Sequence, residues 1–137
     1  MASPESRRRL HQIVGDAELG IIAIDKALDV AMALSGRYRA SVSLPALIPQ
    51  QRGLIESLRN HYAHIDARAM GEAKGKLDPA AVEATYHFGA IVREHRFTDG
   101  VRSISIGAEM TELLVATRGY IVGVLVEIVE RANREGA

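Results

Sequence analysis

Apolar residues recur at alternating spacings of four and three along the first quarter of the chain. This spacing places them on one side of an α-helix and predicts a single long helix over about residues 4–34. Ser3 and Pro4 fit its start, because a hydroxyl can cap the first turn and proline is tolerated at the first helical position. The predicted buried stripe consists of Leu10, Val14, Ala17, Ile21, Ile24, Leu28 and Ala31.

Two further segments show helical spacing, one over about residues 49–70 and one over about residues 108–133. The apolar surface of the last segment is broader than one stripe. This helix therefore lies centrally in a bundle or contacts a second subunit. The predicted buried positions of the two segments are Leu54, Leu58, Tyr62, Ile65 and Ala69, with Ile55 beside them, and Met110, Leu113, Thr117, Ile121, Val124 and Ile128.

Residues 86–106, between these two helices, show a different pattern. Asp99-Gly100 is a dipeptide favoured in two-residue hairpin turns, and Ser103-Ile104-Ser105-Ile106 alternates between polar and apolar side chains. We therefore predict a small β-hairpin here, with His87 and His95 at solvent-facing strand positions. A helix through residues 90–96 is the alternative.

The composition is typical of a helical core. Hydrophobic residues make up 47% of the chain but aromatic residues only 4%, with no Trp, so the core must consist of Ala, Leu, Ile and Val. Such side chains favour close helix packing over a β-sandwich. We predict that residues 1–137 form one mainly α domain, an up-and-down helical bundle with a small β-hairpin before the last helix.

The charge balance and the cysteine content limit the classes of function that are open to this chain. The chain has 17 Lys+Arg and 17 Asp+Glu, whereas a nonspecific nucleic-acid binder normally carries a basic excess. This argues against a DNA-coating role but leaves open an enzyme that meets RNA through a local patch. The absence of cysteine excludes disulfides, thiolate metal sites and thiol catalysis. No apolar run is long enough for a signal peptide or a membrane span, so we expect a cytoplasmic protein without a membrane partner.

The segment richest in side chains that can carry chemistry is Arg59-Asn60-His61-Tyr62-Ala63-His64, in the second predicted helix. Asn60 and His64 are four residues apart and stand one above the other. Arg59 and His64 diverge by about 140° on an ideal helix, so within one chain they point poorly at a common atom.

A second copy of the chain would solve this problem. Small residues lie opposite the predicted core side of the same helix, and small residues allow another surface to come close. They are Gly53, Ala63 and Ala67. If two copies met through this surface, a two-fold axis would gather both motifs around one cleft. We therefore predict a homodimer.

The motif resembles the signature of the HEPN superfamily, in which an Arg and a polar residue, often Asn, precede a His by a short fixed interval. The order of the predicted helices agrees with that family. The resemblance implies a small α-helical bundle that acts as a dimer and as a metal-independent endoribonuclease, with RNA as substrate and no cofactor. Several members are toxins or act in antiviral defence, and a toxin of this kind implies an antitoxin partner that resembles nucleotidyltransferases.

The resemblance also implies roles for the motif residues. His64 would exchange a proton at the RNA 2′-hydroxyl, because imidazole titrates near neutral pH. Arg59 would hold the scissile phosphate and stabilise the negative charge of the transition state. Asn60 would orient Arg59, His64 or the phosphate. The 2′-oxygen would be the nucleophile and a 2′,3′-cyclic phosphate the product.

Three further residues are candidates for substrate contact. His61 would help to position a base, or would simply cap the edge of the core. Lys74 and Lys76 follow the motif helix closely enough to touch a bound RNA backbone.

Explanations of the motif that involve no catalysis remain open. The chain could be a catalytically silent HEPN-like module that binds a nucleotide or a partner protein, or an unrelated helical dimer with an accidental motif. Arg59 and His64 could also be solvated and paired with Glu56 or Asp66. A metal site at His61, His64 and Asp66 lacks a fourth ligand, and its two histidines diverge by about 60°, so we expect no metal.

Overall fold

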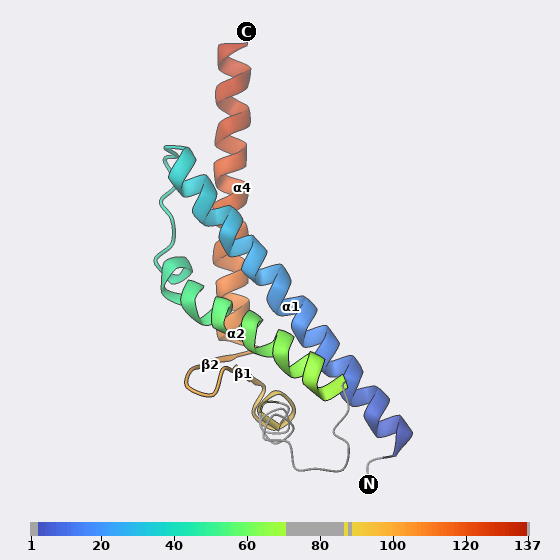
Figure 1. Cartoon of the computed structure of the whole chain (residues 1–137). Coiled ribbons are helices and arrows are strands. Elements are labelled where there is room, and N and C mark those ends of the chain that lie inside the picture. The colour runs from blue at the N-terminus through green and yellow to red at the C-terminus, as the bar shows by residue number, and fades with distance from the viewer. Residues whose placement is uncertain (1–2, 71–86, 88, 137) are drawn as a thin grey trace.

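The computed structural model describes residues 3–70, 87 and 89–136; the side chains of residues 6, 7, 10, 11, 14 and 64–70 fall outside this description. The elements follow in the order α1 (Pro4–Arg37), α2 (Leu47–Met70), a π-helical turn (Ala90–Glu94), β1 (Arg96–Thr98), β2 (Ser103–Ser105) and α4 (Glu109–Glu135). In Figure 1, α1 passes across α4, α2 lies along α1 and converges with it toward the C-terminal end of α2, the hairpin lies near the start of α4, and the C-terminal end of α4 extends beyond the other elements. The predicted mainly α bundle with a hairpin before its last helix is confirmed.

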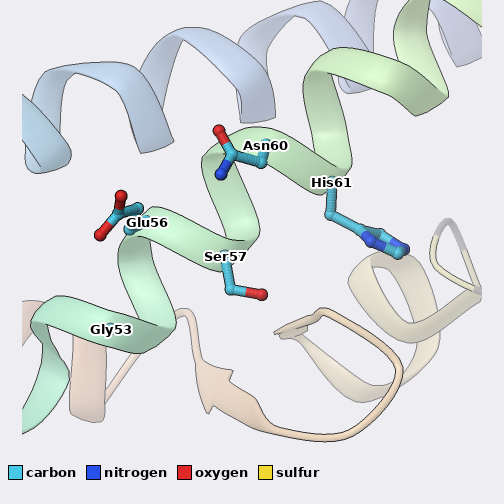
Figure 2. A pocket seen from close by; sticks show the side chains of 5 residues that line it. All are labelled: Gly53, Glu56, Ser57, Asn60 and His61. Carbon is cyan, nitrogen blue, oxygen red and sulfur yellow. The ribbon is translucent and has the colours of Figure 1, made fainter.

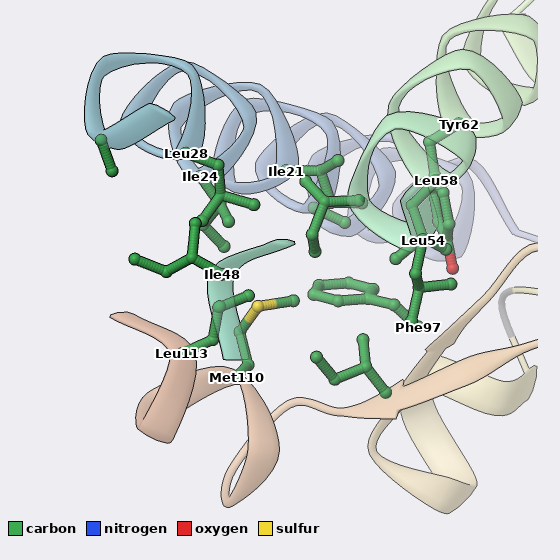
Figure 3. Packing of buried hydrophobic residues seen from close by; sticks show 14 of the residues in the cluster. Ile21, Ile24, Leu28, Ile48, Leu54, Leu58, Tyr62, Phe97, Met110 and Leu113 are labelled. Atoms are coloured by element: carbon green, nitrogen blue, oxygen red, sulfur yellow. The ribbon is translucent and has the colours of Figure 1, made fainter. Parts of the chain in front are cut away.

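Within the described part of the chain, an apolar core lies between α1, α2, α4 and the hairpin. Phe97 of β1 pairs with Ile104 of β2 in the antiparallel register, and both side chains enter this core. Figure 3 shows Phe97 between the side chains of α2 and Met110 of α4. The predicted positions confirmed as buried are Ala17, Ile21, Ile24, Leu28, Ala31, Leu54, Ile55, Leu58, Tyr62, Met110, Leu113, Thr117 and Val124, and Ile121 and Ile128 are partly buried.

The hairpin turn differs by one residue from the prediction. Asp99 and Gly100 do not form its tip, because the N–H of Asp99 donates to the carbonyl oxygen of Arg102 at 3.1 Å and leaves Gly100 and Val101 between them. Gly100 has φ +92°, a conformation that side-chain-bearing residues rarely adopt. Asp99 stabilises the turn with its carboxylate, which accepts from the N–H groups of Val101 and Arg102.

The described residues that precede the hairpin are helical rather than extended. The π-helical turn Ala90–Glu94 agrees in part with the alternative prediction of a helix through residues 90–96. The strand positions predicted for His87 and His95 are therefore wrong. His87 is helical and 2% exposed, with its ring packed against the edge of Tyr62. His95 is exposed and turns the chain into β1 with φ +53°. The ring of His87 packs against His61 and Tyr62 of α2. The local alternation of polar and apolar residues does not reveal this tertiary contact.

Among the described residues, several apolar side chains on one side of α4 are exposed. The broad apolar surface predicted for this helix is buried in part, where it contacts α1, α2, β2 and Val42 of the loop between α1 and α2. The exposed apolar side chains of α4 are Leu114, Val115, Val122, Leu125, Val126 and Val129. In the part of the chain that the structure describes, no helix combines the length and the apolar character needed to cross a membrane.

Candidate functional site

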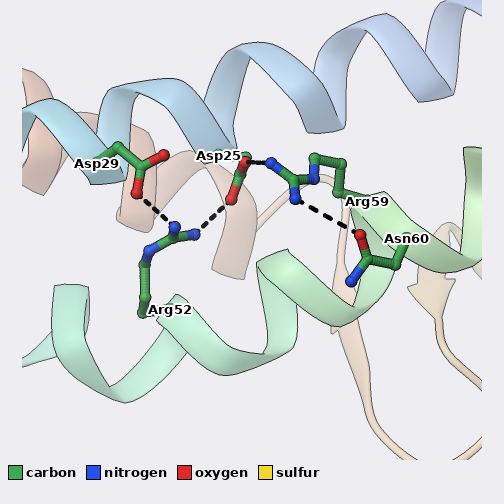
Figure 4. A network of polar contacts seen from close by, with 5 residues as sticks. All are labelled: Asp25, Asp29, Arg52, Arg59 and Asn60. Atoms are coloured by element: carbon green, nitrogen blue, oxygen red, sulfur yellow. Dashed lines mark hydrogen bonds and ion pairs between the residues drawn. The ribbon is translucent and has the colours of Figure 1, made fainter.

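The motif residues leave α2 in different directions. The rotation of α2 is set by Leu54, Leu58 and Tyr62, whose side chains are buried in the core. With the helix held in this way, Arg59 points toward α1 and His61 points toward the segment before the hairpin (Figures 2 and 4).

Arg59 is bound to a buried carboxylate on α1. Its Nη1 donates to Oδ2 of Asp25 at 2.6 Å, and the Asp25 side chain is only 1% exposed. Its Nη2 lies 3.5 Å from Oδ1 of Asn60. The Arg59 side chain is nevertheless 43% exposed, and a guanidinium has five N–H donors, so these two contacts leave donors for a further partner. Asp25, rather than Glu56, forms the ion pair with Arg59; the side chain of Asp66 lies outside the described residues.

A second arginine of α2 binds the same carboxylate. Arg52 donates through Nη1 to Oδ1 of Asp25 and through Nη2 to Oδ1 of Asp29 (Figure 4). Burial opposes the charge of Arg52, but the hydrogen bond and charge of Asp25 outweigh it, and the pKa of Arg52 is raised. Each oxygen of Asp25 therefore has its own guanidinium, which offsets the cost of burying the charge. We call Asp25, Asp29, Arg52 and Arg59 the Asp25 cluster.

An open groove with a volume of about 400 Å³ follows another side of α2. Its lining residues are Gly53, Glu56, Ser57, Asn60 and His61 (Figure 2). Their spacing along the chain forms one continuous stripe on the helix. Asn60 and His61 are thus predicted site residues that share a surface, and Arg59 is connected to this surface through Asn60.

The turn of the hairpin is fastened to this side of α2. Ser57 donates through Oγ to Oδ2 of Asp99 at 2.8 Å, and Nη1 of Arg102 lies 3.7 Å from the position that a Cβ would take on Gly53. Burial opposes ionisation of Asp99. The N–H groups of Arg102 and Val101 and the Ser57 hydroxyl outweigh this effect and lower the pKa of Asp99 to about 2. Asp99 is therefore a charged anchor between the hairpin and the groove.

His61 packs at the edge of the core. Its ring centroid lies 4.5 Å from that of the buried His87, and Tyr62 meets the rings of His87 and Phe97 edge-on at 6.0 and 5.8 Å. Burial raises the pKa of Tyr62 to about 12, so its phenol stays neutral. These contacts agree with the capping role expected for His61, and a contact with an RNA base stays a prediction.

The other predicted site residues are only partly described. The backbone of His64 belongs to α2, but its side chain lies outside the described residues, as do Lys74 and Lys76 altogether. From the predicted site, the structure brings together Arg59 and Asn60, with His61 beside Asn60 in the groove. Where the chain is described, no three His, Asp or Glu residues are grouped so that they could hold a metal ion.

Sequence reasoning missed Asp25 and Arg52, although a signal for both was present. Asp25 falls four residues after Ile21 and three before Leu28, on the apolar stripe of α1, where an unpaired carboxylate would be costly. Arg52 falls seven residues before Arg59 and hence on the same side of α2. A carboxylate on a buried stripe predicts a cation from a neighbouring element, but the sequence does not say which element.

Comparison with protein families, with curated proteins and with solved structures finds no match to this chain. By its fold and its site, the chain is a mainly α protein with a polar groove along α2 and a buried ion-pair cluster between α1 and α2. The HEPN resemblance rests on the six-residue motif and the order of the helices.

Proposed function

We propose that this protein is a metal-independent endoribonuclease of the HEPN type that acts as a homodimer, with Arg59, Asn60 and His64 as its catalytic residues. The observation that carries the proposal is the placement of Arg59. Its guanidinium is held by Asp25 on one side and is still 43% exposed beside Asn60. The rotamer of a guanidinium held in this way is already restricted, so that binding of a phosphate costs little further side-chain entropy.

The reaction would be transesterification within the RNA. The 2′-oxygen attacks the adjacent phosphorus while its proton passes to His64 of one copy. The bond from phosphorus to the 5′-oxygen breaks, and the leaving oxygen takes a proton from His64 of the other copy. Arg59 donates to the non-bridging oxygens, which gain negative charge in the transition state. The products are a 2′,3′-cyclic phosphate and a 5′-hydroxyl.

The two copies would meet through the small residues of α2. Gly53 and Ala63 are exposed, and Gly53 lines the groove beside Asn60 and His61. An isologous contact across this surface brings the two grooves together. The exposed apolar side of α4 is the competing surface for self-association.

Cleavage of a structured RNA in the presence of EDTA tests the activity. We expect His64→Ala and Arg59→Ala each to slow cleavage by about 100-fold or more, because acid–base and electrostatic groups contribute on this scale. His95→Ala and Arg37→Ala are matched controls at exposed positions outside the motif and should cleave like the wild type. RNA with 2′-deoxy substitutions should stay intact, and the products should carry cyclic phosphate ends.

Two results would reject the ribonuclease. One is the absence of cleavage by the wild-type protein. The other is cleavage by His64→Ala at the wild-type rate, which would identify a contaminating nuclease. A wild-type protein that binds RNA or a nucleotide without cleaving it would instead support the catalytically silent module.

Sedimentation of two charged variants tests the dimer surface. We expect Ala63→Glu to give an inactive monomer, because it places a carboxylate at the centre of the proposed contact. Val122→Glu, on the exposed side of α4, should remain an active dimer. The reverse result would assign self-association to α4 and would remove the basis for a shared cleft.

A further inference from the structure

We infer that Asp25 is a positioning residue for the proposed reaction: it fixes the guanidinium of Arg59 in the orientation that receives the scissile phosphate. This inference rests on the proposed ribonuclease activity. It is carried by a single juxtaposition, in which a carboxylate that is 1% exposed on α1 meets Nη1 of Arg59 at 2.6 Å across the interface of α1 and α2.

Packing of the two helices does not by itself require a charge at this position. The neighbouring residues of the stripe, Ile21, Ile24 and Leu28, bury apolar side chains. Replacement of a buried ion pair by well-packed apolar residues is often neutral or even stabilising. The carboxylate at this position is therefore better explained by its effect on the orientation of the bound guanidinium than by a contribution to the stability of the α1–α2 interface.

The Asp25 cluster is asymmetric in a way that favours Arg59 as that cation. Among the ion pairs of the described residues, Arg52 binds both Asp25 and Asp29, whereas Arg59 binds Asp25. Arg52 is 23% exposed, and it offsets the charge of Asp25 that an approaching phosphate would otherwise meet. Arg59 is the more exposed of the two arginines and the one that reaches Asn60.

The geometry also restricts the guanidinium of Arg59. Asp25 holds Nη1 on the buried side, and Asn60 lies beside Nη2 on the groove side. The short bond to Asp25 restricts the orientation of the planar guanidinium, and this orientation sets the direction of the donors that remain. Without Asp25, Arg59 would still be charged and present, but it would sample several rotamers.

Asp25→Asn is the central variant, and Asp29→Asn is its matched control. Asparagine preserves the shape of the side chain and removes its charge. Asp29 is the same residue type one turn further along α1, where it binds Arg52 but is 55% exposed. RNA cleavage is measured with EDTA at saturating and subsaturating RNA, and thermal melting by circular dichroism reports the folded fraction.

We expect Asp25→Asn to lower kcat by about 10- to 100-fold with KM within about threefold of the wild type, because misplacement of a catalytic group affects the transition state most. Asp29→Asn should stay within about twofold in both constants. In an Arg59→Ala background, Asp25→Asn should have no further effect, because Asp25 acts through Arg59. A role confined to folding would lower the melting temperature and the yield equally in both backgrounds.

The inference is overturned if folded Asp25→Asn cleaves RNA like Asp29→Asn. It is also overturned if Asp25→Asn lowers kcat by the same factor with and without Arg59. If Asp25→Asn does not fold, Asp25→Glu replaces it: this variant keeps the charge but displaces it by one methylene, and we expect a lower kcat at unchanged KM. Wild-type kcat and KM in this variant would overturn the inference. If the wild-type protein does not cleave RNA, both the proposed function and this inference are overturned. If the wild type cleaves RNA and the Asp25 variants cleave it equally well, only this inference is overturned.

Discussion

Replacement of Asp99 by asparagine removes one negative charge from the turn that fastens the hairpin to α2. The carboxylate accepts hydrogen bonds from the N–H groups of Val101 and Arg102 and from the hydroxyl of Ser57. Asparagine has nearly the same shape and retains one carbonyl oxygen as an acceptor. The substitution therefore tests the charge of the anchor rather than the shape of the turn.

The size of the effect follows from the pKa. Burial opposes ionisation of Asp99, and the hydrogen bonds outweigh it, so the pKa falls from 3.8 to about 2. A pKa change of this size corresponds to about 2.5 kcal/mol of preference of the folded state for the ionised carboxylate. Water competes for the donors of the exposed turn, so we expect about 1 to 1.5 kcal/mol in practice.

The sign of the pH dependence is determined by the same values. A carboxylate whose pKa is lower in the folded state contributes stability that is fully present above its unfolded-state pKa of 3.8. The contribution is lost as the pH falls through about 2. Asp99→Asn should therefore be less stable than the wild type near neutral pH, and the two should become equally stable only below the lower of these two values.

Urea unfolding, followed by circular dichroism at several pH values from neutral to acidic, measures this difference. Asp16→Asn is the matched control, since Asp16 is an exposed aspartate on α1, and it should differ from the wild type by less than about 0.5 kcal/mol throughout. Two outcomes would contradict a stabilising charge at Asp99. One is no loss of stability near neutral pH, and the other is a loss that persists unchanged when the carboxylates are protonated.

Three further predictions concern the fold. Leu58→Ala, at a fully buried position of α2, should lower the free energy of unfolding by about 3 kcal/mol in a urea titration, and a loss below about 1 kcal/mol would mean that the core closes over the cavity. Gly100→Ala should cost about 1 kcal/mol in calorimetry because of the positive φ, whereas Gly89→Ala, in helical backbone, should not; equal costs would contradict the strain. Glu127→Gln should speed hydrogen exchange of the Ser41 amide, which donates to both carboxylate oxygens, while Glu130→Gln should leave it unchanged; unchanged exchange in both variants would show that this contact does not hold the loop.

The order and type of the helices were predictable because apolar periodicity is a local property. The bounds predicted for the first helix differ from α1 by three residues at its C-terminal end, and those of the second differ from α2 by two residues at its start. The hairpin before the last helix is present, but its strands cover only residues 96–98 and 103–105 of the predicted segment 86–106, and its turn is shifted by one residue. The Asp-Gly dipeptide is compatible with either position, and the burial of Phe97 opposite Ile104 selects the observed one.

The candidate site was only partly predictable. The motif identified Arg59, Asn60 and His61 as candidate site residues on one helix, but it was the structure that placed Asn60 and His61 in a common groove. The direction of Arg59 depends on Asp25, which lies 34 residues earlier in the chain. Spacing within α2 holds no information about a partner on α1.

Local sequence alone is enough to predict that this chain forms amphipathic helices with a small hairpin before the last one, because side-chain periodicity acts over a few residues. It also determined which residues could carry acid–base and phosphate-binding chemistry. Two contacts became visible only in the packed molecule. A buried carboxylate of α1 binds two arginines of α2, and the turn of the hairpin is anchored beside the groove. Such contacts depend on how the helices cross and rotate, and these are set by the packing of the whole core at once.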